Sequence, residues 1–168
     1  MSHAADQLGP LVEENQRAHD AIEDALLDVL ESVTALEMTS ALERWARFLD
    51  RLDAHIAFEE REIFPAYAEL SDHPRGGGPE LFDGDHVTLR KVIAACRTAL
   101  EEITDTVTDQ RRLMVTRLGP LLRLRNVLEH HDLREQRFLY PRLETHLDAE
   151  TCSKLTDGLR ASNRLGQS

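Results

Sequence analysis

The sequence predicts an all-α protein, in which the chain forms an antiparallel up-down four-helix bundle with a short additional C-terminal helix. Apolar residues recur at spacings of three and four along several long segments, as they do in helices that bury one stripe. Aromatic residues make up only 5% of the chain, and the charged residues, 30% of the total, lie among the apolar ones. A chain of 168 residues is near the usual length of one domain, about 150 residues. We therefore expect one domain over residues 1–168.

A capping box separates the first two predicted helices. The Ser40 hydroxyl and the Glu43 carboxylate can satisfy each other's backbone donors, which predicts that the second helix starts there. This helix meets Pro65, which can kink or end a helix because it lacks an N–H. The stripe of the first helix consists of Val12, His19, Ile22, Leu26, Val29, Val33 and Leu36. The stripe of the second consists of Trp45, Phe48, Leu52, His55, Glu59 and Ile63.

A loop rich in Gly and Pro, residues 71–79, separates these helices from the third. The first residue of the third helix stays open, because Gly84 lies near its start and disfavours helix by about 1 kcal/mol. Its stripe consists of Phe82, His86, Leu89, Ile93, Cys96, Leu100 and Ile103.

Residues 119–120, Gly-Pro, mark either a kink in the fourth helix or its first turn. Asp148 can cap a fifth helix that ends near Leu165. The predicted bundle therefore covers about residues 8–146, and the C-terminal helix covers about 148–165. The stripe of the fourth helix consists of Leu121, Leu124, Leu128, His131, Glu135 and Phe138.

The composition argues against several classes of function. Lys and Arg number 20 against 31 Asp and Glu, a formal net charge of −11, and no basic run stands out, so we expect no nucleic-acid partner. Charges interrupt every apolar stretch before the ~18 residues that a membrane helix needs, so no membrane contact is expected. Residues 1–10 lack the basic and apolar regions of a secretory signal, which predicts a cytoplasmic protein. Cys96 and Cys152 are expected to be reduced thiols.

An internal repeat relates the two halves of the chain. Residues 55–65 and 131–141 share a His, a Glu four residues later, an Arg and a final Pro. Each copy is preceded by one histidine on the stripe of the previous helix, His19 in the first half and His86 in the second. We therefore expect a site with pseudo-twofold symmetry.

Six polar side chains occupy positions on the stripes where apolar residues belong. Because residues four apart share a helix face, each His-x-x-x-Glu pair presents an imidazole and a carboxylate together. Such groups are costly to bury unless something satisfies them, and they suit first-row transition metals. Four histidines can hold two ions at two apiece, and two glutamates can bridge the ions, which leaves open positions for an exogenous ligand. The predicted ligands are His19, His55, Glu59, His86, His131 and Glu135.

A simpler interpretation exists for each residue taken singly. A lone histidine on an apolar stripe is more often a hydrogen-bonded core residue than a metal ligand. A single His-x-x-x-Glu is equally common as a solvent-exposed pair on a helix surface. Two repeated pairs, each preceded by a stripe histidine on a separate helix, favour the metal interpretation instead.

The remaining polar residues are weaker candidates. Solvent exposure is the simpler expectation for Glu60 and for Glu62, although Glu62 lies one turn beyond Glu59 and is a candidate outer carboxylate. Arg90 and Tyr140 are further outer candidates, while helix-end packing is the simpler account of Tyr140 and of Tyr67. The other four histidines are expected at the edge of the bundle, in solvent or in loops: His3, His73, His130 and His146.

The order of the six candidate ligands resembles the six-ligand type of the hemerythrin-like (HHE cation-binding) domain, over nearly the whole chain. The segment His-x-x-x-Glu-Glu-x-x-Ile-Phe-Pro at residues 55–65 is also similar to that family. The resemblance implies an up-down bundle with a non-haem di-iron centre, two iron ions joined by an oxo or hydroxo bridge. Manganese or zinc in place of iron stays open.

The sequence departs from the oxygen carriers of this family at two places. Carriers have a further histidine at the position of Arg90, and their last motif, His-x-x-x-x-Asp, would put an aspartate at Gln136. With two histidines per metal both ions are open, which favours reaction over oxygen storage. Similar six-ligand proteins are linked to nitric-oxide or peroxide stress and to iron-centre repair. Ferritin chemistry is not expected, because no histidine has a glutamate three residues before it.

We therefore expect a di-iron protein that binds and reacts with O2, H2O2 or NO, as a catalase-like or NO-related oxidoreductase if it is an enzyme. The alternative is a non-catalytic module that binds or senses O2, NO or iron, and a third reading is a bundle that holds zinc or no metal. The expected partner is a small-molecule ligand, and the chain is expected to be a monomer or a weak homo-oligomer. The electron donor stays open.

Overall fold

The structure, a computed structural model, describes residues 9–106 and 108–165, and these residues form helices and turns without a strand. The predicted all-α class is confirmed, since the described chain is a helical bundle. Its elements are α1 (Pro10–Thr34), α2 (Met38–Phe58), η1 (Glu59–Ile63), α3 (Phe64–Ala68), α4 (Pro79–Asp105), α5 (Gln110–Arg117), α6 (Gly119–Arg134), η2 (Glu135–Leu139), α7 (Tyr140–His146) and α8 (Ala149–Leu165), where η denotes a π-helical turn.

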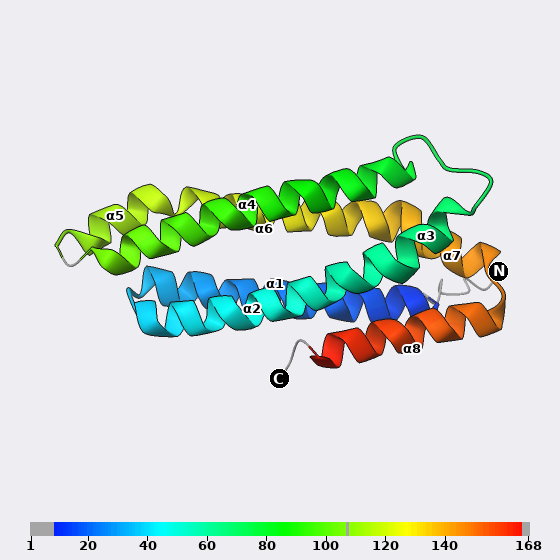
Figure 1. The fold of residues 1–168 in the computed structure, drawn as a ribbon, viewed down its shortest axis with the longest axis horizontal. Coiled ribbons are helices and arrows are strands. Elements are labelled where there is room, and N and C mark those ends of the chain that lie inside the picture. The colour runs from blue at the N-terminus through cyan, green and yellow to red at the C-terminus, as the bar shows by residue number, and fades with distance from the viewer. Residues whose placement is uncertain (1–8, 107, 166–168) are drawn as a thin grey trace, which may run out of the picture.

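Four long helices lie side by side, with α1 next to α2 and α4 next to α6 (Figure 1). The helix α2 continues through η1 into α3, and α6 continues through η2 into α7. The C-terminal helix α8 packs against α1 and α2 on the outside of the bundle (Figure 1). Each of the four long helices can therefore present one face to a shared interior.

The helix starts settle two points that the sequence leaves open. The third long helix, α4, begins at Pro79, so Gly84 lies inside it, exposed and with no atom within 4 Å of a Cβ placed there. Residues 119–120 are the first turn of α6 and not a kink within it, because α5 ends before them. The predicted cap of α8 is present, since the Thr151 N–H donates to Asp148 Oδ1 at 2.8 Å.

The prediction that a capping box of Ser40 and Glu43 starts the second helix is wrong. The helix α2 begins earlier, at Met38, and no side chain caps it. The chain reverses within three residues after α1, with Leu36 at φ 61°, and the Met38 side chain is buried in the core. Because this tight turn and this core contact fix the start of α2, Ser40 falls inside its first turn.

The two prolines of the internal repeat lie inside helices that continue past them. In each π turn an N–H donates to the carbonyl five residues earlier, from Phe64 to Glu59 and from Tyr140 to Glu135. The proline that follows would clash with the carbonyl four residues before it in a regular α-helix, and the wider turn relieves that clash. Each π turn begins at one of the two candidate glutamates, so both glutamates lie where the helix geometry changes.

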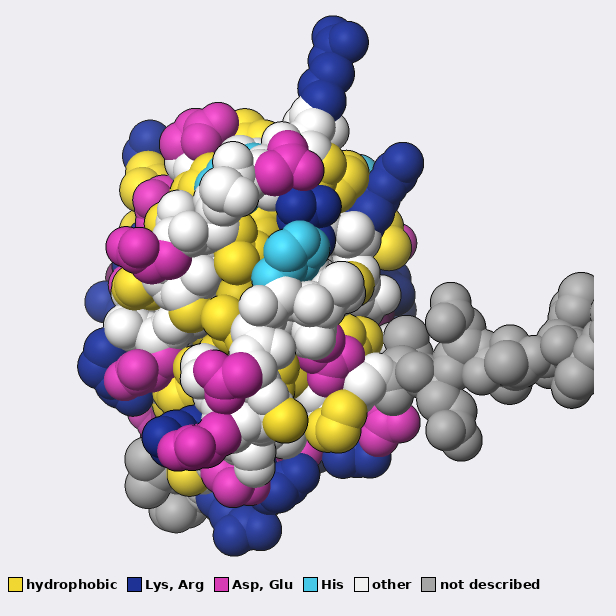
Figure 2. Space-filling model, turned by 90° about the vertical axis from the view of Figure 1, so that its right-hand side faces the viewer, with side chains coloured by type: hydrophobic (Ala, Val, Ile, Leu, Met, Phe, Trp, Pro, Cys, Tyr) yellow, Lys and Arg dark blue, Asp and Glu magenta, His cyan; other side chains and the backbone are white. Residues whose placement is uncertain are grey.

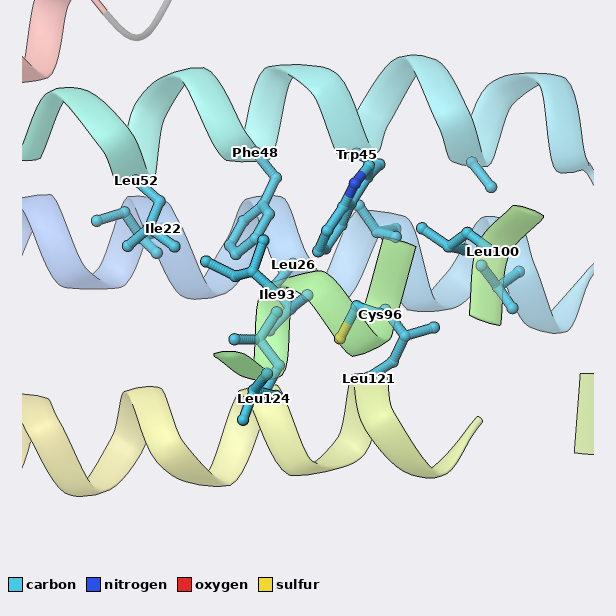
Figure 3. Close-up of a cluster of buried hydrophobic side chains, with 14 of the residues drawn as sticks. Ile22, Leu26, Trp45, Phe48, Leu52, Ile93, Cys96, Leu100, Leu121 and Leu124 are labelled. Carbon is cyan, nitrogen blue, oxygen red and sulfur yellow. The ribbon is translucent and has the colours of Figure 1, made fainter. Parts of the chain in front are cut away.

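Two apolar clusters fill the interior. The large core, shown in Figure 3, joins α1, α2, α4 and α6 and includes Ile22, Leu26, Trp45, Phe48, Leu52, Ile93, Cys96, Leu100, Leu121 and Leu124. The small core lies at the end of the bundle with α3 and α7 and consists of Leu11, Val12, Phe58, Ile63, Phe64, Tyr67, Phe82, Leu139, Tyr140, Leu143, Leu155 and Leu159.

A polar layer separates the two cores. Along α1, Val12 belongs to the small core and Ile22 to the large core, and His19 lies between them. The same order recurs along α4, where His86 takes the middle place. The candidate ligands are thus enclosed by apolar packing on both sides along the bundle axis.

Both cysteines are free, as predicted. Cys96 is buried in the large core, and burial raises the pKa of its thiol to about 12. Burial also raises the pKa of Cys152, which is half-buried on α8. Both thiols therefore stay protonated at neutral pH, the form that is a poor nucleophile and a poor metal ligand.

The described surface carries charges of both signs. Figure 2 views the end of the bundle near α3 and α7, where acidic and basic side chains lie interspersed around the face. None of the described helices combines the length and apolar character that crossing a membrane requires.

A neighbouring pair on α6 tests the position of the core. Leu121 is fully buried, whereas Leu122 is 47% exposed. We expect Leu121→Ala to lower the free energy of unfolding by about 2–5 kcal/mol, because it leaves a cavity in the large core. Leu122→Ala should change it by less than about 0.5 kcal/mol. Urea denaturation of both variants measures this, and equal losses would contradict the assigned core face of α6.

Candidate metal centre

The polar layer contains all six residues that the sequence selects as candidate ligands. One histidine comes from each long helix, from α1, α2, α4 and α6, and the two glutamates begin η1 and η2. None of the six is more than 9% exposed. They are His19, His55, Glu59, His86, His131 and Glu135.

The six residues form two groups that share both glutamates. One group contains His19 and His55, the other contains His86 and His131, and within each group the nitrogen and oxygen atoms lie within 4.8 Å of one another. The four histidines thus divide into one pair from α1 and α2 and one pair from α4 and α6.

Glu59 presents one oxygen to each histidine pair. Its Oε1 lies 3.1 Å from His55 Nε2, and its Oε2 lies 3.3 Å from His86 Nε2 and 3.9 Å from His131 Nε2. The carboxylate is therefore placed across the gap between the two groups.

Glu135 spans the same gap from the opposite side. Its Oε2 lies 3.3 Å from His19 Nε2, and its Oε1 lies 3.4 Å from His131 Nε2. Each carboxylate thus has one oxygen near each histidine pair, which is the arrangement of two bridging carboxylates.

A pair of cations would satisfy the buried nitrogen and oxygen atoms of these residues better than the surrounding protein groups do. Both Glu135 oxygens, Glu59 Oε2 and His86 Nε2 are buried and have no hydrogen-bond partner among the described residues. Buried polar atoms without a partner are rare, because each costs about 1–3 kcal/mol. His19 Nε2 and His55 Nε2 also face each other at 2.8 Å, so two ring nitrogens converge on one point. Four nitrogens and four oxygens directed inward match the ligands that first-row metals take.

Carboxylates hold the outer nitrogens of two histidines, one in each half of the chain. Asp132 hydrogen-bonds His19 Nδ1, and Glu60 Oε1 lies 3.0 Å from His86 Nδ1. Asp85 Oδ2 lies 3.8 Å from His131 Nδ1, near enough for a charge interaction but too far for a hydrogen bond. A carboxylate at Nδ1 keeps the proton there and leaves the Nε2 lone pair free to bind a metal.

Arginines and an amide in turn hold these outer carboxylates. Arg90 binds both Glu60 oxygens at 2.8 and 2.9 Å, and Arg134 pairs with Asp85. Gln136 Nε2 donates to Asp132 Oδ1 at 2.7 Å. Arg90 and Gln136, the two positions where the sequence departs from the oxygen carriers, are thus both engaged in the outer layer of the centre.

The other two histidines lack such a hydrogen bond. Nδ1 of His55 and Nδ1 of His131 are both buried without a hydrogen-bond partner among the described residues, and only His131 has a carboxylate, Asp85, nearby. By the alignment of the repeat, the residue that corresponds to Asp85 is Ala18, which has no carboxylate. The outer layer is therefore asymmetric although the inner six residues are not.

Tyr140 introduces a second asymmetry. Its hydroxyl donates to Glu59 Oε1 at 2.7 Å, and the whole side chain is buried. The corresponding residue in the first half is Phe64, whose ring lies 4.8 Å from the His86 ring. One glutamate is thus oriented by a phenol, and the other has no equivalent donor.

The two glutamates also differ in protonation. Burial raises the pKa of Glu135 well above its usual value, and the nearby negative charge of Glu59 adds to the rise. Burial acts on Glu59 in the same direction, but the nearby imidazoles of His55, His86 and His131 outweigh it and hold the pKa of Glu59 well below its usual value. Two carboxylates this close cannot both ionise easily, so in the metal-free chain Glu135 keeps the proton.

Burial lowers the pKa of His55 and of His131. Both rings are therefore neutral at neutral pH, which is the form that binds a metal. For His86, burial acts in the same direction, but the nearby carboxylates of Glu59 and Glu60 outweigh it and raise the pKa.

A small pocket adjoins the centre between α1, α2 and α6. Its volume is about 60 Å³, and its wall includes His19, His55 and His131 together with Leu26 and Leu52. One water molecule needs about 10–15 Å³ by this measure. The pocket therefore has room for a few water-sized molecules next to the histidines.

The outer layer separates the two glutamates that follow Glu59. Glu62 is exposed, as the simpler expectation had it, with Arg61 at 2.9 Å as its contact, and it is not an outer carboxylate of the centre. A spacing of three from Glu59 would share its face in an α-helix, but the wider π turn rotates Glu62 away. Glu60 takes the outer place instead, although its side chain is 36% exposed, because Arg90 and His86 on α4 hold it.

Sequence reasoning missed Asp85, Asp132 and Arg134. All three lie one residue away from a predicted ligand, to the side of the apolar stripe, where charged residues are ordinary. The sequence feature that could have identified the two aspartates is their position, since Asp85 and Asp132 each lie next to a stripe histidine.

The other histidines lie outside the centre. His130 and His146 are exposed, as the sequence predicts. His73 is half-buried, with its Nε2 at 3.0 Å from the Tyr67 carbonyl. Tyr67 donates its hydroxyl to the Gly77 carbonyl at 2.7 Å and takes no part in the centre. His3 lies outside the described residues.

Comparison with known families agrees with this geometry. The model of a family described as Hemerythrin HHE cation binding domain matches residues 10–118. The match ends before His131 and Glu135, so the structure is what brings these two residues into the cluster. Searches of curated proteins and of solved structures found no match.

The phenol of Tyr140 gives a test with a matched control. We expect Tyr140→Phe to weaken metal binding about 10-fold or more, because the oriented Glu59 carboxylate loses its hydrogen bond. Tyr67→Phe also removes a buried hydroxyl with a 2.7 Å hydrogen bond, but away from the centre, and should leave metal affinity unchanged. Competition titration with a metal chelator measures both affinities. Equal affinities in the two variants would remove Tyr140 from the centre.

Proposed function

Because the chain belongs to the hemerythrin HHE cation-binding domain family, we propose that its six buried His and Glu residues hold two iron ions in an antiparallel up-down four-helix bundle. We further propose that this centre binds and reacts with O2, H2O2 or NO. The observation that carries the proposal is the placement of the glutamates, each with one oxygen near each histidine pair.

The ligand set supports two ions that stay accessible. Two histidines and one oxygen from each of two shared glutamates give each ion four protein ligands. Iron commonly takes more than four ligands in bundle centres of this kind, so positions remain for an exogenous ligand. Bound there, a pair of redox-active metal ions supplies Lewis acidity and electrons to a small ligand.

The chain's own residues set the charge of the centre. Glu59 and Glu135 give −2 at most, less than the charge of any pair of divalent ions. The outer carboxylates lie on the far side of the imidazoles, and Arg90 and Arg134 balance Glu60 and Asp85. The negative charge of the protein ligands is therefore smaller than the positive charge of two bound ions, and this difference favours an anionic or electron-rich ligand.

The surroundings favour small ligands. The adjoining pocket of about 60 Å³ has leucines on its wall and reaches three of the four histidines. The large and small cores close the centre at both ends along the bundle axis. Diatomic molecules and peroxide fit this space, whereas an organic substrate does not.

Neighbouring histidines on α6 test the metal centre. His131 is 3% exposed with its Nε2 facing both glutamates, whereas His130 is exposed. We expect wild type and His130→Ala, grown with iron, to hold about two iron ions per chain. His131→Ala should hold less than half as much, because one ion loses one of its two histidines. Elemental analysis of folded protein, checked by circular dichroism, measures this.

Equal iron content in the two variants would place the metal elsewhere. Zinc in place of iron, or no metal after reconstitution, would remove the redox function and leave a metal-binding or structural bundle.

The reactivity has its own test. We expect the iron-loaded wild type to consume H2O2 catalytically and to change its absorption spectrum with NO, and His55→Ala, if folded, to lose both properties. Oxygen evolution and stopped-flow absorption measure them. If the iron-loaded protein binds NO or O2 reversibly but does not turn over peroxide, the centre serves binding or sensing instead. If it responds to none of these ligands, the proposed function is wrong.

A further inference from the structure

An arginine-lined pocket lies where α1, α2 and α8 meet, away from the metal centre. Its volume is about 280 Å³, and it shares no lining residue with the pocket beside the histidines. Its four basic side chains come from three helices and from distant parts of the sequence: Arg17, Arg51, Arg160 and Arg164.

The charge of this pocket runs against that of the chain. The chain has a formal net charge of −11, but the pocket wall carries four guanidinium groups, which are always protonated, and one carboxylate, Glu14. Glu13 pairs with Arg17 and Asp157 with Arg160, and all four of these side chains are 42–70% exposed, so water screens both pairs. Four guanidinium groups against three carboxylates leave an excess of one positive charge at the pocket.

Three of the four arginines are held in place before any ligand arrives. Arg51 Nη1 donates to the Ala21 carbonyl at 2.9 Å, which fixes a side chain of α2 against α1. Arg17 and Arg160 both donate to Glu14 Oε2 at 3.3 Å, and Glu14 is only 6% exposed. The one buried carboxylate of the pocket thus orients two guanidinium groups from two helices.

Each of these arginines keeps unused donors. A guanidinium has five N–H donors, and the bonds to Ala21 and to Glu14 use only some of them. Two of the residues on the wall, Ala18 and Ala21, have only a methyl side chain, so the space between the guanidinium groups stays open.

We propose that this pocket binds a small phosphate-bearing anion. Several guanidinium groups that converge from different helices suit a phosphate, which has three or four acceptor oxygens and close to two negative charges at neutral pH. A carboxylate ligand would offer only two acceptor oxygens and one negative charge. Glu14 already supplies a carboxylate to these arginines within the protein. The bound anion ties the C-terminal helix α8 to α1 and α2, and so stabilises the packing of α8 on the bundle.

The test measures binding of inorganic phosphate to the full chain by calorimetry, at constant ionic strength, with chloride as the reference anion. Metal-free and iron-loaded protein are both titrated. We expect saturable binding of one phosphate with a dissociation constant below about 1 mM in both forms. Glucose 6-phosphate is titrated in parallel, and the tighter of the two probes shows whether free phosphate or a phosphate ester is the preferred ligand.

Variants locate the binding. Arg51→Gln combined with Arg164→Gln should weaken phosphate binding at least tenfold, because it removes two charge-assisted donors from the wall. Arg123→Gln, an exposed arginine of α6, is the matched control and should bind as wild type. His131→Ala should also keep phosphate binding, which separates this site from the metal centre.

The melting temperature provides a second readout. Phosphate should raise it in wild type and in Arg123→Gln, but not in the double variant, since a ligand that binds only the folded state stabilises it. Absence of saturable binding at constant ionic strength, or equal affinity in the double variant and wild type, would overturn the proposal.

Discussion

The burial of two facing carboxylates is the constraint on which the rest of the structure depends. Glu59 and Glu135 lie in a layer enclosed by apolar side chains, where two adjacent negative charges are strongly disfavoured without cations. The surrounding features all bear on this problem. Four imidazole nitrogens face the carboxylates, a phenol donates to one of them, and the π turns place both at the start of a widened helical turn. A pair of cations resolves the conflict that these residues create.

The pseudo-twofold symmetry of the sequence is kept where the cations would bind and is lost around them. The six inner residues are of the same types at corresponding positions of the two halves. Outside them, Ala18 in the first half corresponds to Asp85 in the second, and Phe64 corresponds to Tyr140. Since outer hydrogen bonds tune the basicity of the ligands, the two halves offer chemically different sites. Each pair has one histidine whose outer nitrogen is hydrogen-bonded by a carboxylate, but Asp85 lies 3.8 Å from the outer nitrogen of His131, whereas no carboxylate of the described residues lies that near the outer nitrogen of His55.

Sequence alone predicts the parts of this molecule that depend on regular helical spacing. The stripe histidines and the His-x-x-x-Glu pairs follow from the positions that an α-helix places on one face, and the structure brings all six together. Features that depend on a departure from the α-helix, or on contact between distant helices, were not predictable in this way. Glu60 was expected in solvent, but His86 and Arg90 on another helix hold it, and the start of α2 was misplaced because a tight turn overrides local capping. The arginine pocket joins positions 17, 51, 160 and 164, which no local pattern connects.

The π turns also divide the two long helices that contain them, α2–α3 and α6–α7, into two segments with different angular phase. On α2, the buried apolar residues up to Ile56 pack into the large core, whereas Phe58 and the buried apolar residues after Glu59 pack into the small core. The extra residue in each turn therefore acts as a phase shift along the helix. Removing one residue between positions 60 and 62 would restore a regular helix and leave the residues beyond it on nearly the same faces, because four α-helical residues turn the chain about as far as the five residues of the π turn. Phe64 and Tyr67 would keep their side of the helix, but the ring of Pro65 would meet the carbonyl four residues before it, so the length of this short segment is tied to the proline that follows it.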